Sequence, residues 1–281
     1  MAGNRTKIAV VTGASAGIGR HTALGLARAG MRVIMVGRDP ERTEAARRLV
    51  AERVPGAELE TAIADFSRLD AVRALAAEIG TRHERLDVLI NNAGLISPRY
   101  AVSPDGYELT FAVNHLAPFL LTNLLLDRLT GSARSRVITV ASQAHKGASL
   151  NLAAMTQPSG WTPLSAYGTS KLANILFTRA LARRLDPAIV TASCLHPGVI
   201  ATDIGDRAGS LAGLGWRLAK LFLPGPDKGA ATSIFLATIA DPTPFHGRYV
   251  IGKTVVQPDA AARDDELGEA LWNDSKRLVR L

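Results

Sequence analysis

Residues 10–20 read VVTGASAGIGR, with glycines at positions 13, 17 and 19 between an apolar run and a helical pattern. Gly13 allows the sharp turn that this junction requires, and Gly17 and Gly19 allow the backbone to approach a ligand closely. A helix that begins here presents free N–H groups, which attract an anion such as a pyrophosphate. Because the turn follows the first apolar run of the chain, it predicts a strand, a phosphate-binding turn and a helix.

The rest of the chain alternates apolar runs rich in β-branched residues with helical patterns, which is typical of a parallel sheet with crossover helices. We expect strands at about 7–11, 32–36, 58–64, 86–91, 135–141, 190–195 and 249–251. We expect helices at about 18–29, 40–53, 69–82, 106–129, 165–185 and 228–240. The predicted fold is therefore α/β: one Rossmann-type, doubly wound parallel sheet of seven strands with helices on both faces, forming a single domain over residues 1–281.

Two segments lie outside this alternation, at about 143–164 and 196–226. Each follows the carboxyl end of an expected strand, and open α/β sheets bind their ligands at that edge. We therefore expect the two segments to form the walls of a substrate pocket.

Composition excludes several classes of protein. Lys and Arg number 33 against 25 Asp and Glu, a net charge of +8, but the basic residues are interspersed with acidic ones, so we expect no nucleic-acid binding. One cysteine, Cys194, rules out a disulfide framework, and no Cys/His cluster has metal-ligand spacing, so we expect no metal site. No signal-peptide pattern and no uninterrupted apolar run of about 18 residues is present, which favours a cytoplasmic location.

Further signals follow the later expected strands in order. They are Asp65-Phe66, Asn91-Asn92-Ala93-Gly94, Asn114, Ser142, Tyr167-Gly168-Thr169-Ser170-Lys171 and Pro197-Gly198. With the TGxxxGxG spacing of residues 12–19, these motifs resemble the short-chain dehydrogenase/reductase family over about residues 7–255. Residues 111–116 and 167–174 most resemble its retinol dehydrogenase-like branch, including bacterial members. The resemblance implies hydride transfer between a nicotinamide dinucleotide and a small-molecule carbonyl or alcohol, often by a homo-oligomer.

The second expected strand ends without a carboxylate, at Gly37-Arg38. An acidic residue at this point holds the ribose hydroxyls of NAD, whereas a nearby arginine accommodates the 2′-phosphate of NADP. Asp39 is better explained as the cap of the next helix. Arg38, helped by Arg20, therefore favours NADPH over NADH, although Ala16 stands where many NADP-preferring relatives carry a basic residue. The glycine-rich turn, the end of the second expected strand and the family resemblance together predict the cofactor contacts. They are Gly13, Ser15, Gly17, Ile18, Gly19, Arg38, Asp65, Phe66, Asn91, Ala93, Gly94, Tyr167, Lys171, Pro197, Gly198, Val199 and Thr202.

The candidate catalytic pair is Tyr167 and Lys171, which share one helix face because they are four residues apart. A nearby ammonium stabilises a phenolate, so we expect Lys171 to lower the tyrosine pKa from about 10 and Tyr167 to act as a general acid. Ser142, just past the fifth expected strand, can donate to the substrate oxygen as negative charge develops there. The resemblance adds a contact from Lys171 to the nicotinamide ribose and a water held by Asn114 that completes a proton relay. For Asn114, a satisfied core amide is the alternative.

The expected substrate is a bulky, largely apolar ketone or aldehyde of the retinoid, steroid, polyketide or aromatic type. Residues 210–223 place four leucines and Phe222 on one helical face, with Arg217 and Lys220 as the charges of the segment, a pattern that fits a lid and is also compatible with peripheral membrane contact. Trp161 and Trp216 add aromatic surface in the two wall segments. His145 and His196 lie in or next to these segments, and the sequence assigns neither a catalytic role.

Three alternatives have distinguishable signatures. A nucleotide-sugar epimerase or dehydratase would need a TGxxGxxG turn, which is missing. A dinucleotide sensor or scaffold without turnover should have lost part of the Tyr167, Lys171 and Ser142 set, which is complete here. NAD-dependent alcohol oxidation uses the same residues and is separated from NADPH-dependent reduction only by Arg38.

Overall fold

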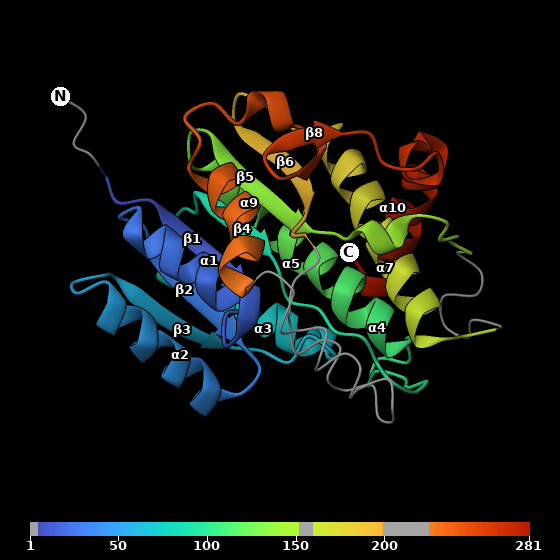
Figure 1. Ribbon diagram of the computed structural model, residues 1–281. Helices are drawn as coiled ribbons and strands as arrows, with labels where there is room; N and C mark the ends of the chain where they lie inside the picture. Colours follow the sequence, from blue (N-terminus) through green and yellow to red (C-terminus); the bar gives the residue numbers. More distant parts are fainter. Residues whose placement is uncertain (1–4, 152–159, 199–224) are drawn as a thin grey trace.

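The computed structural model describes residues 5–151, 160–198 and 225–281 (Figure 1). Its strands are β1 (Ile8–Thr12), β2 (Arg32–Gly37), β3 (Leu59–Ile63), β4 (Val88–Asn91), β5 (Ser135–Val140), β6 (Val190–His196), β7 (Tyr249–Ile251) and β8 (Thr254–Val256). Its α-helices are α1 (Gly17–Arg28), α2 (Pro40–Arg53), α3 (Leu69–Arg82), α4 (Leu109–Phe111), α5 (Ala117–Leu124), α6 (Leu126–Thr130), α7 (Pro163–Ala182), α9 (Pro226–Thr238) and α10 (Asp265–Val279). The shorter helices are the π-helix η1 (Ala112–Leu116) and the 3-10 helices η2 (Gln143–His145), η4 (Thr243–Phe245) and η5 (Ala261–Arg263).

Within the described residues, eight strands form one sheet in the order β3-β2-β1-β4-β5-β6-β7-β8. All neighbours from β3 to β7 pair in parallel, so the predicted doubly wound sheet and its seven strands are confirmed. The eighth strand, β8, was not predicted and pairs antiparallel with β7. The two residues that join them, Gly252 and Lys253, both have positive φ, as tight hairpin turns require.

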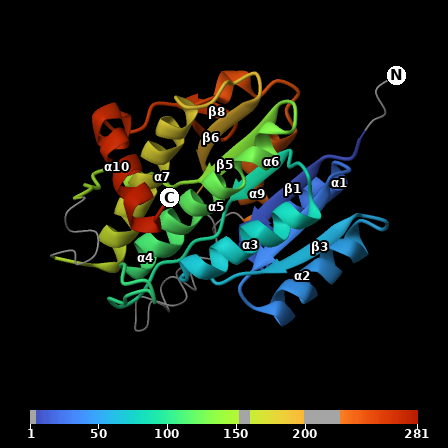
Figure 2. The ribbon, with the colours of Figure 1, turned by 180° about the vertical axis from the view of Figure 1, so that it is seen from behind.

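Helices cover both faces of the sheet, as predicted. Helices α1, α2 and α9 pack on one face around a cluster that includes Leu26, Val50 and Leu236 (Figure 1). Helices α3, α5, α7 and α10 cover the other face, which the reverse view shows in front (Figure 2). Burial of apolar surface between these layers is the main stabilising contribution to the fold.

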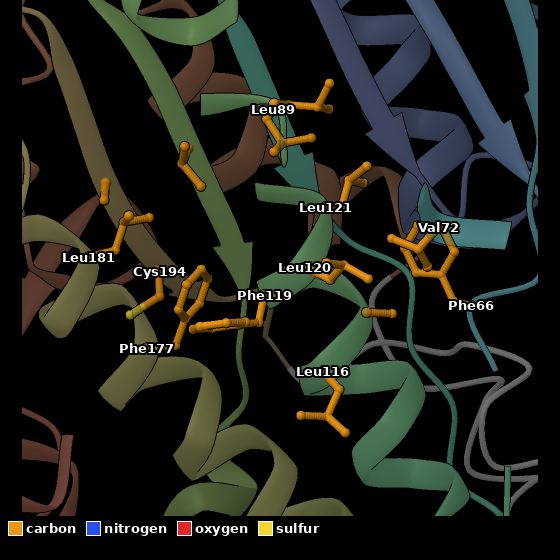
Figure 3. Close-up of a cluster of buried hydrophobic side chains, with 14 of the residues drawn as sticks. Phe66, Val72, Leu89, Leu116, Phe119, Leu120, Leu121, Phe177, Leu181 and Cys194 are labelled. Carbon is orange, nitrogen blue, oxygen red and sulfur yellow. The ribbon is translucent and has the colours of Figure 1, made fainter. Parts of the chain in front are cut away.

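The larger cluster is centred on two facing phenylalanines, Phe119 of α5 and Phe177 of α7 (Figure 3). Their ring centroids lie 5.4 Å apart, and Trp272 of α10 packs against both. Cys194 lies beside Phe177 and is fully buried, so it belongs to the core. Helix α10 was not predicted, yet its apolar face completes this core.

The prediction of one continuous helix over 106–129 is wrong. The chain forms α4, then the π-helix η1, then α5 and α6. Pro118 explains the irregularity, because proline has no N–H to donate to the Asn114 carbonyl four residues earlier. The N–H of Ala117 instead reaches back five residues to the carbonyl of Ala112. Insertions of this kind are frequent at functional sites.

No helix within the described ranges is long and apolar enough to cross a membrane.

Candidate active site

The glycine-rich turn follows β1 at the point where the strand order reverses between β1 and β4. Gly13 and Gly17 have φ of +67° and +51°, a region that favours glycine. A Cβ on Gly19 would lie 2.2 Å from the carbonyl oxygen of Gly13, so no side chain fits there. Asn92 fixes the turn from the next strand, since its Nδ2 donates to the carbonyl of Thr12 at 2.8 Å. The turn is thus a cradle in which three glycines bring the backbone close to the space that a pyrophosphate would occupy.

A cavity of about 440 Å³ extends from this turn along the carboxyl ends of the strands. Most of the predicted cofactor residues line it: Gly13, Ser15, Gly17, Ile18, Gly19, Arg38, Asp65, Phe66, Ala93, Gly94, Tyr167, Lys171 and Pro197. Two described cofactor residues, Asn91 and Gly198, are not among its lining. Asn91 is buried, and its Nδ2 donates to Thr122 Oγ1 at 2.9 Å.

Several predicted features lie outside the described residues. They are Val199, Thr202, Trp216, the segment 210–223 interpreted as a lid or membrane-contacting helix, and residues 152–159 and 199–224 of the two wall segments. Trp161 is described and does not line the cavity. Its Nε1 donates to Glu108 Oε1 at 3.2 Å, which attaches the first wall segment to the residue that precedes α4.

Two arginines line the cavity at the end of β2. Arg38 follows the strand and Arg42 lies one helical turn later, and both are exposed. In the described part of the chain, neither guanidinium takes part in an ion pair. Asp39 caps α2, because its Oδ1 accepts the N–H of Arg42 at 3.0 Å, as expected. The sequence analysis did not identify Arg42 as a candidate phosphate ligand, although its position four residues after Arg38 could have suggested it. Arg20, which was expected to help Arg38, does not line the cavity.

Tyr167 and Lys171 face the other end of the cavity from α7. The helix begins with Pro163 and is capped by Thr162. The Thr162 hydroxyl accepts the N–H of Ser165, and the Ser165 hydroxyl accepts the N–H of Thr162. This cap sets the start of the helix, so Tyr167 and Lys171 lie one turn apart on the same face. The Lys171 Nζ lies 5.4 Å from the centre of the Tyr167 ring.

The protonation states of this pair are governed by burial. Burial raises the pKa of Tyr167 above its usual value of 10, and a hydrogen bond with the Ser142 side chain opposes the rise. Burial lowers the pKa of Lys171 to about 8, and its Nζ donates to the carbonyl of Val140 at 2.9 Å. The prediction that the ammonium lowers the phenol pKa is therefore wrong for this structure, since burial raises this pKa and the contribution that opposes the rise comes from Ser142 and not from Lys171. Tyr167 keeps its proton at neutral pH, which is the form that a general acid requires.

Ser142 follows β5 and begins η2. Its Oγ accepts the N–H of Ala144 at 3.2 Å, and its side chain is near enough to Tyr167 to lower the pKa of that phenol, although Ser142 is not among the residues that line the cavity. The serine hydroxyl and the phenol are thus close enough to contact one substrate oxygen together.

Asn114 is buried in the π-helix, and its side-chain amide is satisfied by protein groups. Its Oδ1 accepts the N–H of Leu95 at 2.8 Å, and its Nδ2 donates to the Leu95 carbonyl at 2.9 Å and to Ser170 Oγ at 3.0 Å. The alternative of a satisfied amide therefore describes the side chain. The group with spare capacity is the Asn114 carbonyl, because Pro118 supplies no α-helical donor to it.

Comparisons with known proteins agree with this geometry. The family model described as short chain dehydrogenase matches residues 7–211. Human retinol dehydrogenase 13 is 39% identical, over 98% of this chain and 85% of its own. A crystal structure of an uncharacterised protein from Mycobacterium paratuberculosis is 35% identical, with a TM-score of 0.78 over 98% of this chain and 93% of its own. A short chain dehydrogenase from Escherichia coli, solved as a complex with NADPH, is 24% identical, with a TM-score of 0.70 over 88% of this chain and 97% of its own.

Proposed function

This chain belongs to the short-chain dehydrogenase family, in its retinol dehydrogenase-like branch, and we propose that it is an NADPH-dependent reductase of bulky, largely apolar ketones or aldehydes. As a member of this family it is an oxidoreductase of small molecules that uses a nicotinamide dinucleotide. One observation carries the proposal further. Tyr167 and Lys171 line the same cavity as the glycine-rich turn, and the Ser142 side chain is near enough to the tyrosine to affect its pKa.

NADPH is proposed over NADH because two arginines line the cavity where the 2′-phosphate is expected, and within the described residues neither guanidinium takes part in an ion pair. Arg38 and Arg42 line that end of the cavity, and guanidinium groups recognise phosphate with paired N–H donors. Asp39 also lines the cavity, but its Oδ1 is engaged as the cap of α2. The Escherichia coli relative in complex with NADPH is consistent with this choice.

The chemistry follows from the protein groups around one carbonyl oxygen. When bound, the reduced nicotinamide supplies a hydride to the carbonyl carbon. Tyr167 donates its proton to the oxygen, and the Ser142 hydroxyl stabilises the negative charge that develops there. Lys171, by resemblance, holds the nicotinamide ribose. The Asn114 carbonyl is the group proposed to hold the water that returns a proton to this pair.

The apolar lining near the catalytic groups supports the proposed substrate class. Leu95 and Ile96 follow β4, and Leu109 and Val113 come from α4 and η1, so hydrocarbon surface borders the cavity there. Such a wall binds an extended apolar substrate better than a small polar acid. The similarity to retinol dehydrogenase 13 makes retinoids the first compounds to test.

The test is a screen of the purified protein with NADPH against all-trans-retinal, aromatic ketones and polyketide-like ketones, followed by loss of the absorbance of reduced nicotinamide. Parallel assays with NADH, and with NAD and the corresponding alcohols, address the alternative of alcohol oxidation. We expect turnover of at least one apolar carbonyl with NADPH at the highest kcat/KM. Tight NADPH binding without turnover of any compound would instead support a sensor.

A further inference from the structure

Two buried histidines contact the same peptide unit, the one that joins Ser142 to Gln143. The Nδ1 of His145 lies 2.7 Å from the carbonyl oxygen of Ser142. The N–H of Gln143 donates to the Nδ1 of His196 at 3.3 Å. His145 belongs to η2 and His196 ends β6, and their side chains belong to residues only 1% and 7% exposed. Both polar groups of the peptide unit after Ser142, the proposed oxyanion donor, are therefore hydrogen-bonded to a histidine.

These contacts assign opposite tautomers to the two rings. A carbonyl oxygen only accepts, so His145 carries its proton on Nδ1, and its free Nε2 accepts the N–H of Asp259 at 3.3 Å. His196 accepts through Nδ1 and so carries its proton on Nε2. Both rings are neutral in this arrangement. An added proton on either ring would place two donors face to face and break one of the bonds.

We propose that His145 and His196 are positioning residues that hold the Ser142 peptide in the orientation that aims its hydroxyl at the substrate oxygen, and that protonation of His196 on acidification releases it. The inference rests on the proposed function, because it assigns Ser142 its role in the reaction. Catalytic groups need their supporting contacts, since small displacements of a donor lose much of its effect.

The surroundings of the two rings determine the direction of the pH effect. His145 and Lys146, in and after η2, face His196, while Tyr249 of β7 packs on His145 with ring centroids 5.2 Å apart. The carboxylate of Asp259 is directed to the N–H of Gly147 at 3.0 Å. Burial lowers the pKa of His196 below its usual 6.5, and the nearby His145 and Lys146 lower it further. His196 is thus neutral at pH 7, and turnover should fall only as the pH drops below about 6.5.

The test compares two variants of His196 in the full-length protein with NADPH and the best carbonyl from the screen. His196→Asn keeps a short side chain with an acceptor but cannot titrate, whereas His196→Leu removes the acceptor. We expect His196→Leu to lower kcat about tenfold with KM for NADPH unchanged. We expect His196→Asn to keep kcat within about threefold at pH 8 and to lose the decline below pH 6.5.

His246→Leu is the matched control. His246 also accepts a backbone N–H through Nδ1, from Ala192 at 3.3 Å. Ala192 lies on β6, four residues before His196, so this bond is away from Ser142. This variant should lose stability and keep both the wild-type kcat and its pH profile. A wild-type kcat in His196→Leu, or an unchanged acid decline in His196→Asn, would overturn the proposal.

A second measurement does not depend on activity. Nitrogen chemical shifts of the imidazoles at pH 7.5 should show the proton of His145 on Nδ1 and that of His196 on Nε2. The same tautomer in both rings would overturn the clamp even in an active enzyme. If the wild type turns over no carbonyl, the proposed function fails, and the tautomers still decide whether the two histidines hold this peptide.

Discussion

The two ends of the cavity present polar groups in opposite ways. Beside β1 and β2 the ligand would meet backbone N–H groups of a glycine turn and two exposed arginines, Arg38 and Arg42. Beside β5 and α7 it would meet the half-buried Tyr167 and the buried Lys171, whose Nζ donates to the Val140 carbonyl. The first end is suited to recognising an anion by shape and free charge. The second is suited to setting protonation states by desolvation.

Substitutions at the two ends of the cavity should therefore affect different steps, coenzyme binding at the first end and proton transfer at the second. Alterations at the glycine turn and arginines change the affinity for the coenzyme, because these groups are proposed to bind its phosphates and to transfer no proton. Alterations at Tyr167 and Lys171 change proton transfer and its pH dependence, because their charges are governed by burial.

The largest effect should come from Tyr167→Phe, which removes the proposed acid and keeps the ring. We expect turnover to fall by about 10²- to 10⁴-fold, with NADPH affinity within about twofold of the wild type. Steady-state kinetics and calorimetric titration measure the two quantities. Tyr107→Phe is the control, since it removes another phenol hydroxyl, which donates to the Leu278 carbonyl at 2.8 Å. Wild-type turnover in Tyr167→Phe would show that Tyr167 is not the acid and that proton transfer is not carried out at this end of the cavity.

The next effect should come from Gly19→Ala, which tests the end that binds by shape. The new Cβ would lie 2.2 Å from the Gly13 carbonyl oxygen and 2.6 Å from Asn92 Nδ2, so the turn must open. We expect NADPH affinity to fall about 100-fold, in line with the cost of overpacking a rigid site. Gly80→Ala in α3, whose Cβ would be 3.5 Å from its nearest neighbour, is the control and should leave affinity unchanged. Equal NADPH affinities in the Gly19→Ala and Gly80→Ala variants would contradict the proposal that the glycine-rich turn binds the pyrophosphate.

Sequence reasoning predicted the sheet well because its strands are buried and parallel. Such strands appear as short β-branched runs, and β7 was predicted with the bounds that the structure shows. The exposed strand β8 has only three residues, too few for a pattern. Helix α10 has a clear amphipathic pattern, but no expected strand comes after it, so the strand–helix–strand alternation that identified the other helices did not point to it.

The candidate site was less predictable, because its properties depend on partners distant in sequence. Asn114 is satisfied by Leu95, 19 residues away, and the peptide after Ser142 is held by His196, 53 residues from Gln143. A pKa depends on how deeply a group is buried, and the spacing of Tyr167 and Lys171 carries no information on that. The spacing did predict that the two side chains face one cavity, since helical periodicity is local.

A smaller effect should follow from replacing both arginines, in the variant Arg38→Ser, Arg42→Ser. Loss of charged donors to a 2′-phosphate should weaken NADPH binding about tenfold and leave NADH binding within about twofold. Titration of both coenzymes measures the ratio, and Arg48→Ser on the same helix is the control, because Arg48 pairs with Glu44 and does not line the cavity. An unchanged ratio would mean that other groups select the coenzyme.

The smallest effect should be on stability, through the cost of burying Lys171. Its pKa is about 8 in the folded protein against an ordinary value of 10.5, so between these values the unfolded chain binds more protons than the folded one. Stability contributed by this group therefore rises as the pH increases through about 8. Lys171→Met lacks the titration, and we expect it to melt about 5 °C above the wild type at pH 7, with the difference shrinking by pH 9. Tyr167 does not interfere, because its raised pKa keeps it neutral over this range. Lys7→Met, at an exposed position, should show no such convergence. A constant difference between pH 7 and pH 9 would mean that the ammonium is solvated, and the contrast between the two ends of the cavity would then be one of position only.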